Sequence, residues 1–382
     1  MADVAREAGV SIASVSYALN DQPGVSAASR VRILAEAERL GFSTDRLARG
    51  LRRGATQLIG LLVPDIANPF YPEIAAGVID AASASGYQVL ICQVGLNATH
   101  QEAEANKLLD LRVDGLIFTG LVGSDRPLVT RLLNRGVPLV QAVRRLPRLT
   151  ADHVGIDDRA AGAELASYLL ELGHRDITVF TGPSASSASR GRLAGYRAAF
   201  EERQLSLPAE RILHLDLTYA AGYEAAGRVF DSGRRLPTAI IAGNDVMATG
   251  VIDAVLDHGR LVPEEVSVVG YDDMSFSGSR LLGLTTVHQP RHELGVTAVE
   301  LLLSRLESPD LRARTVLLPH HLKIRSSSAA PAQPRRTGGR GRLSSVPVAS
   351  APAEGDRLDG QRPAGRVPIA SAGPDPAFQE RK

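Results

Sequence analysis

Two pairs of adjacent carboxylates are the groups in this sequence best suited to acid–base or ligand chemistry. Asp157-Asp158 and Asp272-Asp273 each follow a short apolar run in the 382-residue chain. Such carboxylates can transfer protons as general acids and bases, or they can accept hydrogen bonds from a polar ligand. No spacing in the sequence places one pair opposite the other, so we favour the ligand role. Arginine, amide and aromatic residues that follow other apolar runs would complete a polar site.

The motifs of common enzyme sites are absent. The sequence contains no Gly-x-x-x-x-Gly-Lys-Ser/Thr loop, no Gly-x-Gly-x-x-Gly after an apolar run and no Gly-x-Ser-x-Gly elbow. His292-Glu293 lacks the second histidine of a zinc protease, and His320-His321 is an isolated pair expected on the surface or in the core. The single cysteine, Cys92, excludes an intramolecular disulfide and a multi-cysteine metal site. We therefore expect no catalytic residue, no metal and no cofactor.

Composition places the chain among globular proteins of two or three domains. Hydrophobic residues make up 44% and charged residues 22%, and 382 residues exceed what one core usually holds. No apolar run approaches the roughly 18 residues of a membrane span, and the charged start lacks a signal peptide. We expect a cytoplasmic protein without membrane contacts. The net charge of +1 conceals a basic excess at both ends, which weakly indicates an anionic partner.

The elements that must position these residues follow three patterns along the chain. Residues 1–44 have helical periodicity, whereas residues 58–325 alternate short apolar runs with amphipathic stretches. The alternation predicts two lobes, each a doubly wound parallel sheet flanked by helices, with crossings between lobes near residues 157 and 288. Ligands of such folds bind at the carboxyl ends of strands, so we expect a cleft between the lobes. Residues 326–382 are rich in proline and glycine and predict a disordered tail.

The first twenty residues predict two short helices joined by a tight turn. Small apolar residues would bury one face of the first helix, and Gly9 would end it in the left-handed conformation. Ser11 can cap the second helix, with Val15 turned inward, and Ser26–Leu40 supplies a third helix. This arrangement is typical of a helix-turn-helix, whose second helix enters the major groove of DNA. The alternative is an ordinary helical mini-domain.

Segments spread over residues 1–325 carry a resemblance to one protein family. Residues 5–20 read AREAGVSIASVSYALN, and residues 45–53 read DRLARGLRR. The other segments are Ile59–Phe70, Arg112–Gly115, Leu172–Arg175, Ala242–Asp245, Val268–Asp273 and Leu284–Pro290. In type and order they resemble the DNA-binding head, hinge helix and body of the lactose-repressor/galactose-repressor (LacI/GalR) family of bacterial transcription regulators.

The resemblance implies a homodimeric repressor that binds a pseudo-palindromic operator in double-stranded DNA. Residues 1–44 would bind DNA, 45–57 would form the hinge helix and linker, and 58–325 would bind effector and dimerise in a periplasmic-binding-protein-like fold. The residues implied in DNA contact are Ser11, Ile12, Ala13, Ser14, Ser16, Tyr17 and Asn20 in the head, and Ala48, Leu51 and Arg52 in the hinge. A nine-residue helix is marginal alone, so we expect the hinge to form only with DNA and the partner subunit.

The resemblance also implies a small-molecule effector, a sugar or related metabolite, held between the lobes. Two aromatic residues after the first strand could stack on a ring, and polar residues after later strands could bind its hydrogen-bonding groups. The residues expected to bind effector are Phe70, Tyr71, Arg192, Asn244, Asp272 and Gln289.

Three departures from the family pattern limit which family properties can be expected of this protein. Tyr17 stands where many members have arginine, and a phenol cannot read guanine bidentately, so the operator sequence does not transfer. Val143 stands where many members have an aspartate that binds a sugar hydroxyl, which predicts a less hydroxyl-rich effector or a site carried by the other lobe. The family usually has three or four more residues before Asp3, so either the chain is truncated or its start lies upstream.

Two other classes of function compete with the repressor. A pure sugar-binding protein would have a secretion signal and no helical head, and the sequence has the reverse. A cytoplasmic small-molecule-binding α/β protein or enzyme without specific DNA binding would use the paired aspartates, but no motif supports it. Salt-sensitive binding to DNA would separate the repressor from both.

Overall fold

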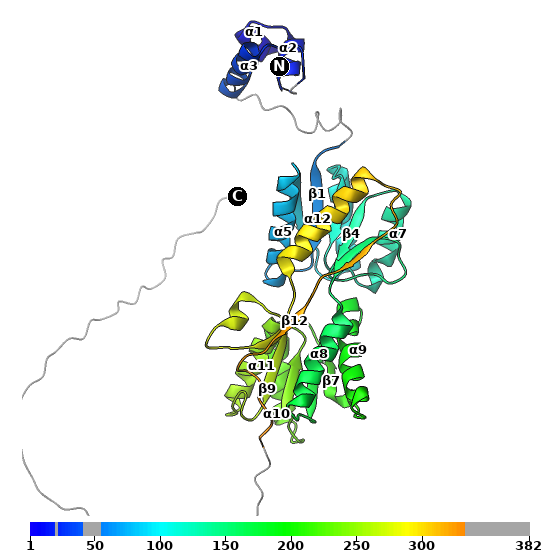
Figure 1. Ribbon diagram of the computed structural model, residues 1–382, viewed down its shortest axis with the longest axis vertical. Coiled ribbons are helices and arrows are strands. Elements are labelled where there is room, and N and C mark those ends of the chain that lie inside the picture. The colour runs from blue at the N-terminus through cyan, green and yellow to red at the C-terminus, as the bar shows by residue number, and fades with distance from the viewer. Residues whose placement is uncertain (20–21, 41–54, 333–382) are drawn as a thin grey trace, which may run out of the picture. The chain divides into compact units, whose positions relative to one another are not determined.

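The computed structural model describes residues 1–19, 22–40 and 55–332, which form a helical head and an α/β body (Figure 1). The helices of the head are α1 (Ala2–Ala8), α2 (Ile12–Leu19) and α3 (Ala27–Arg39). Gly9 ends α1 at φ 63°, and its N–H donates to the carbonyls of Ala5 and Arg6. The small core of the head consists of Val4, Ala5, Ala8, Val15, Ala18, Ile33 and Ala37. The predicted helix-turn-helix is therefore confirmed.

The body contains two six-stranded sheets, one in each lobe. Lobe 1 has the order β11-β5-β4-β3-β1-β2, and lobe 2 has the order β12-β10-β9-β8-β6-β7. The strands of lobe 1 are β1 (Leu58–Val63), β2 (Gln88–Gln93), β3 (Gly115–Phe118), β4 (Leu139–Ala142), β5 (Asp152–Gly155) and β11 (Thr315–Leu317). Those of lobe 2 are β6 (Ile177–Thr181), β7 (Ile212–His214), β8 (Ala239–Ala242), β9 (Ser267–Asp272), β10 (Thr285–His288) and β12 (His321–Lys323).

Helices cover both faces of each sheet, as continuous apolar strands require. In lobe 1, α5 (Phe70–Ala84) and α12 (Arg291–Glu307) share one hydrophobic cluster, and α6 (Ala98–Asp110) and α7 (Arg126–Asn134) share another. In lobe 2, α8 (Asp158–Glu171) pairs with α9 (Ser187–Glu202), and α10 (Tyr219–Asp231) pairs with α11 (Asp245–Asp257). The two predicted α/β lobes are confirmed. No helix in the described ranges is long and apolar enough to cross a membrane.

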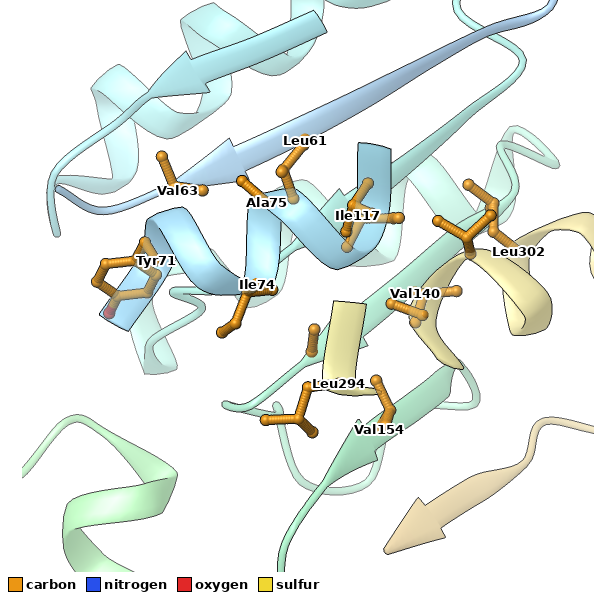
Figure 2. Close-up of a cluster of buried hydrophobic side chains, with 14 of the residues drawn as sticks. Leu61, Val63, Tyr71, Ile74, Ala75, Ile117, Val140, Val154, Leu294 and Leu302 are labelled. Atoms are coloured by element: carbon orange, nitrogen blue, oxygen red, sulfur yellow. The ribbon is translucent and has the colours of Figure 1, made fainter. Parts of the chain in front are cut away.

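Figure 2 shows part of the hydrophobic core of lobe 1. Leu61 and Val63 of β1 pack with Ile74 and Ala75 of α5. Tyr71, on the first turn of α5, lies at the edge of this cluster (Figure 2). The burial of its neighbours therefore fixes the backbone from which Tyr71 projects.

Both predicted crossings between the lobes are tight turns. At Asp157 (φ −79°, ψ 87°) the N–H of Asp158 donates to the carbonyl of Ile156, and Pro290 has nearly the same conformation. These are inverse γ-turns, which are common at strand ends. A third crossing, between β11 and β12, was not predicted. It makes β12 antiparallel to β10, so the second sheet is not purely parallel.

The predicted body boundary after residue 325 is wrong, because residues 326–332 belong to lobe 2. The Ser327 carbonyl accepts from the N–H of Val268 at 2.8 Å, and the Ser328 hydroxyl lies 2.7 Å from that of Thr285. Both serine side chains are buried and form hydrogen bonds with β9 and β10, a placement that a polar composition does not reveal. The predicted tail beyond residue 332 lies outside the described residues.

Three helix pairs cross so closely that each crossing requires glycine. Between α5 and α12, a Cβ on Gly77 would lie 2.0 Å from the carbonyl oxygen of His292, and one on Gly295 would lie 2.2 Å from that of Ile74. The pairs α8/α9 and α10/α11 use Gly162 with Gly195 and Gly222 with Gly250 in the same way. Since a larger side chain would force the backbones apart, these crossings fix the helices that carry the site residues.

Candidate functional site

The first candidate site is the outer face of α2. Ser11 caps this helix, its Oγ accepting from the N–H of Ser14 at 3.0 Å. Ile12 is 54% exposed and Tyr17 43% exposed, whereas Val15 is fully buried. Ala13 is exposed as well, and Ser14 and Ser16 are half-buried. The predicted DNA-facing residues of α2 therefore share the accessible side of the helix. The other predicted DNA contacts, Asn20, Ala48, Leu51 and Arg52, lie outside the described residues.

The second candidate site is a cavity between the lobes. Its volume is about 30 Å³ in this conformation, enough for roughly one water molecule. Five of the six residues expected to bind effector line it, namely Phe70, Tyr71, Arg192, Asn244 and Asp272. They come from both lobes and lie at helix starts or after strands, as the doubly wound topology requires.

Arg192 is held on every side by lobe 2. Its Nε lies 2.9 Å from Asp158 Oδ1, its Nη1 donates to the carbonyl of Gly243 at 2.8 Å, and its Nη2 is 3.9 Å from Asp272 Oδ1. The guanidinium also lies over the ring of Tyr271, 3.5 Å from its centre. One carboxylate from each of the two acidic pairs thus meets at a single arginine, which the sequence did not indicate.

Asp272 is a buried carboxylate in an uncommon conformation. Its φ is 112°, a region that side chains other than glycine rarely adopt. Burial raises the pKa of Asp272 to about 7, against the opposing effect of nearby Arg192. Gln289 donates to Asp272 Oδ1 at 2.6 Å and does not line the cavity. In this conformation Gln289 therefore positions the carboxylate of Asp272. The effector contact that the sequence predicts for Gln289 is not seen in the cavity lining.

Asn244 has a structural role in addition to its place in the cavity. Its Oδ1 accepts from the N–H of Met247 at 2.8 Å and caps α11, while its Nδ2 donates to the Leu217 carbonyl at 3.3 Å. The next residue, Asp245, is fully buried and accepts from the hydroxyls of Ser277 and Thr286, both at 2.6 Å. Burial raises the pKa of Asp245 to about 6, although these hydrogen bonds oppose the shift. The start of α11 is thereby tied to β10 and to the short 3₁₀ helix Ser275–Gly278 that follows β9.

The remaining carboxylates and histidines singled out in the sequence have structural partners. Asp157 caps α8, and Asp273 pairs with Arg325 at 2.6 Å and with His288 at 2.9 Å. His321 stacks on His288 with ring centres 4.8 Å apart. Among the described residues no group of three or more His, Cys, Asp or Glu side chains could hold a metal ion.

Sequence reasoning missed several residues that line the cavity. These are Asn68, Arg144, Ser186, Ala188, Ser189 and Leu217, and Val143 was noted only as a departure from the family. Arg144 lies two residues after β4, so its position near a strand end was a signal that could have found it. The serines belong to the loop and first turn that begin α9.

The combination of a helix-turn-helix head with a two-lobed α/β body defines the class of bacterial transcription regulators that have a periplasmic-binding-protein-like domain. Residues 1–45 match the family model for bacterial regulatory proteins of the lacI family, and residues 166–328 match that for a periplasmic binding protein-like domain. The chain belongs to the LacI family.

The comparisons extend over nearly the whole length of known family members. The chain is 33% identical to catabolite control protein A of Priestia megaterium over 85% of this chain and 98% of that protein. It is 33% identical to the ribose operon repressor of Escherichia coli (strain K12) over 86% and 99%. A solved structure of the lac repressor dimer bound to operator and an anti-inducer matches with TM-score 0.78 and 28% identity, over 86% of this chain and 98% of that one. These relatives are transcriptional regulators and not enzymes.

Proposed function

We propose that this protein represses transcription by binding a pseudo-palindromic operator as a homodimer, and that a small metabolite in the interlobe cavity controls the binding. The observation that carries the proposal is the joint presence of an accessible α2 face and a polar cavity built from two lobes. The first suits readout of base edges in the major groove. The second suits a ligand whose binding changes the angle between lobes.

The residues of α2 suit apolar and hydroxyl contacts with DNA. The helix carries no charged side chain, so it would read base edges while cations elsewhere bind phosphates. Ile12 and Ala13 would pack on thymine methyl groups, and Tyr17 would donate its hydroxyl to a base or phosphate. In the hinge, Leu51 would wedge a base step open in the minor groove, between Ala48 and Arg52.

Exposed apolar side chains support the homodimer. They include Tyr219, Tyr223, Leu256 and Leu281 in lobe 2, and Ile66, Ile79, Ile91 and Leu96 in lobe 1. Leu281 is fully exposed, and a second subunit would remove such side chains from water. A dimer would also place two heads on the two halves of an operator.

A cavity of about 30 Å³ is too small for a sugar, so effector entry requires the lobes to separate. Contacts across the cleft, such as the Arg145 N–H donating to Ser187 Oγ at 3.0 Å, would then break. Lobe movement would shift the two hinges of a dimer, and short hinge helices would form or melt in response. We propose a sugar or related metabolite as the effector and release from DNA as its effect.

The experiment is selection of bound sequences from a random double-stranded DNA pool by the full chain. We expect an inverted repeat to be enriched, and affinity for it to fall steeply with salt. Exchanging Ile12 and Ala13 for the pair of another family member should change the preferred half-site. Val31→Ala, at a 70% exposed position on α3, is the control that should keep it. Binding without sequence preference would support the competing small-molecule-binding protein.

A further inference from the structure

Arg144 is a buried cation at the wall of the interlobe cavity. It follows β4 in lobe 1 and is only 7% exposed. Its Nη1 is buried and has no hydrogen-bond partner, and its Nη2 makes only a 3.4 Å contact with the hydroxyl of Tyr71. Among the described residues Arg144 forms no ion pair. Arg144 therefore lines the cavity without an ion-pair partner in the described part of the chain.

Neighbouring carboxylates do not supply the missing partner. Asp125 lies close enough for the charge of Arg144 to act against the rise that burial causes in the pKa of this carboxyl, but the two side chains form no ion pair. Asp125 Oδ2 accepts from the N–H of Val122 at 2.7 Å, and its buried Oδ1 has no hydrogen-bond partner among the residues that the structure describes. In the cavity wall, Asp272 lies beside Arg192 and Gln289. Arg192 is already paired with Asp158. Among the charged residues that line the cavity, Arg144 is therefore the one for which no ion pair is found in the described part of the chain.

The backbone before Arg144 explains how this cation reaches the cavity. The N–H of Arg144 donates to the carbonyl of Ala142 at 2.7 Å, which closes a γ-turn around Val143. The φ of Val143 is 67°, an outlier for a β-branched residue. Strained backbone of this kind is retained mainly where surrounding structure and function require it. Here it turns the chain so that Arg144 lines the site.

We infer that the effector of this protein carries an anionic group, a phosphate or a carboxylate, and that Arg144 binds it. Burial of a guanidinium without an ion-pair partner costs hydration free energy that no protein contact compensates. An anion bound at Nη1 would compensate this cost. The planar fork of arginine suits phosphate and carboxylate oxygens, which accept two parallel hydrogen bonds. The inference rests on the proposed effector function of the cavity and specifies a sugar phosphate or sugar acid over a neutral sugar.

The test is thermal unfolding of the full chain in sodium phosphate and in sodium chloride at equal ionic strength and pH. Inorganic phosphate should raise the unfolding temperature of the wild type by a few degrees over chloride, because it binds the folded state alone. Arg144→Gln should lose most of this increase. Arg145→Gln, which removes an exposed neighbouring charge that does not line this cavity, should keep it.

Two results would overturn the inference: an equal phosphate shift in wild type and Arg144→Gln, or no shift in the wild type. If Arg144→Gln does not fold, Arg144→Lys replaces it, and the shift should then shrink because lysine lacks the planar fork. A parallel measurement in sodium acetate distinguishes a carboxylate from a phosphate as the anionic group of the effector. A matching shift indicates a carboxylate, and a shift with phosphate alone indicates a phosphate ester.

The operator experiment keeps this test apart from the proposed function. Suppose that neutral sugars release the protein from a selected operator, and that phosphate raises the unfolding temperature equally in wild type and Arg144→Gln. These results would refute the anionic effector but would still support the proposed repressor function. If phosphate raises the unfolding temperature only when Arg144 is present, but the chain selects no operator, the anion site would be supported and the repressor function refuted.

Discussion

The two lobes each contribute one buried arginine to the same cavity, and the two arginines differ in every contact. Arg192, from lobe 2, has a carboxylate, a backbone carbonyl and an aromatic ring around its guanidinium. Arg144, from lobe 1, has one long contact with a phenol hydroxyl and a buried nitrogen without a partner. Lobe 2 therefore provides a preorganised wall, whereas lobe 1 provides a group whose partner must come from outside. The difference separates a residue that holds the site together from one available to recognise its ligand.

The largest expected effect is that of Arg192→Ala on stability. Removing one member of a buried ion pair typically costs about 3–5 kcal/mol, because the other charge stays buried without compensation. Here the carbonyl of Gly243 would lose the guanidinium donor, and Asp158 would keep, among the described residues, only the hydroxyl of Tyr271, at 3.2 Å. Urea unfolding of the variant and wild type would measure the loss. Arg190→Ala, at an exposed position two residues earlier in α9, is the control and should change stability by less than about 0.5 kcal/mol.

The second effect concerns the ion pair itself. Asp158→Asn should lower the unfolding free energy by roughly 1.5–3 kcal/mol, the usual contribution of hydrogen bonds to charged groups. The double variant with Arg192→Ala should lose less than the sum of the two single changes, since both remove the same contact. Strictly additive losses in this cycle would show that Arg192 is held by Gly243 and Tyr271 and not by Asp158.

The sequence predicted part of each wall of the cavity, with Phe70 and Tyr71 in lobe 1 and Arg192, Asn244 and Asp272 in lobe 2. Arg192 and Asp272 could be placed near the site because periodicity locates strand ends, and strand ends of parallel sheets share one edge. The pairing of Arg192 with Asp158 could not, because it depends on the glycine crossing of α8 and α9. Arg144 was missed for a local reason, since no property of valine predicts a positive φ at Val143.

The same physical distinction applies elsewhere in the chain. Gly9 and Ser11 could be predicted in their capping roles, because a tight turn and a helix start have strong local preferences. The serines after residue 325 could not, because their hydrogen bonds reach β9 and β10, far away in the sequence. Local geometry can be inferred from residue types, whereas long-range polar partners need the fold.

A smaller effect is expected in the pH dependence that Asp272 contributes. Burial raises the pKa of Asp272 from its ordinary value of 3.8 to about 7, so the folded state binds the proton more tightly. The stability that this protonation contributes is complete below pH 3.8 and is lost as the pH rises through about 7. Asparagine at position 272 does not titrate, so Asp272→Asn lacks this loss of stability. The unfolding temperature of the variant, relative to that of the wild type, should therefore rise between pH 5 and pH 8. A constant difference over this range would show that Asp272 is ionised throughout and neutralises the cavity itself.

The smallest expected effect is that of Arg144→Gln on stability in the absence of added anions. The substitution leaves no carboxylate behind without a partner, since Arg144 forms no ion pair within the described residues. It removes a desolvated charge, which is favourable, and a weak contact with Tyr71, which is unfavourable. We therefore expect a change below about 1 kcal/mol in either direction, measured by urea unfolding in chloride buffer beside Arg192→Ala. A loss as large as that of Arg192→Ala would mean that Arg144 has a strong internal partner, and the contrast between the two lobes would fail. A small change would leave the guanidinium of Arg144 as a group that contributes little to folding, which is the property expected of a residue retained for its ligand.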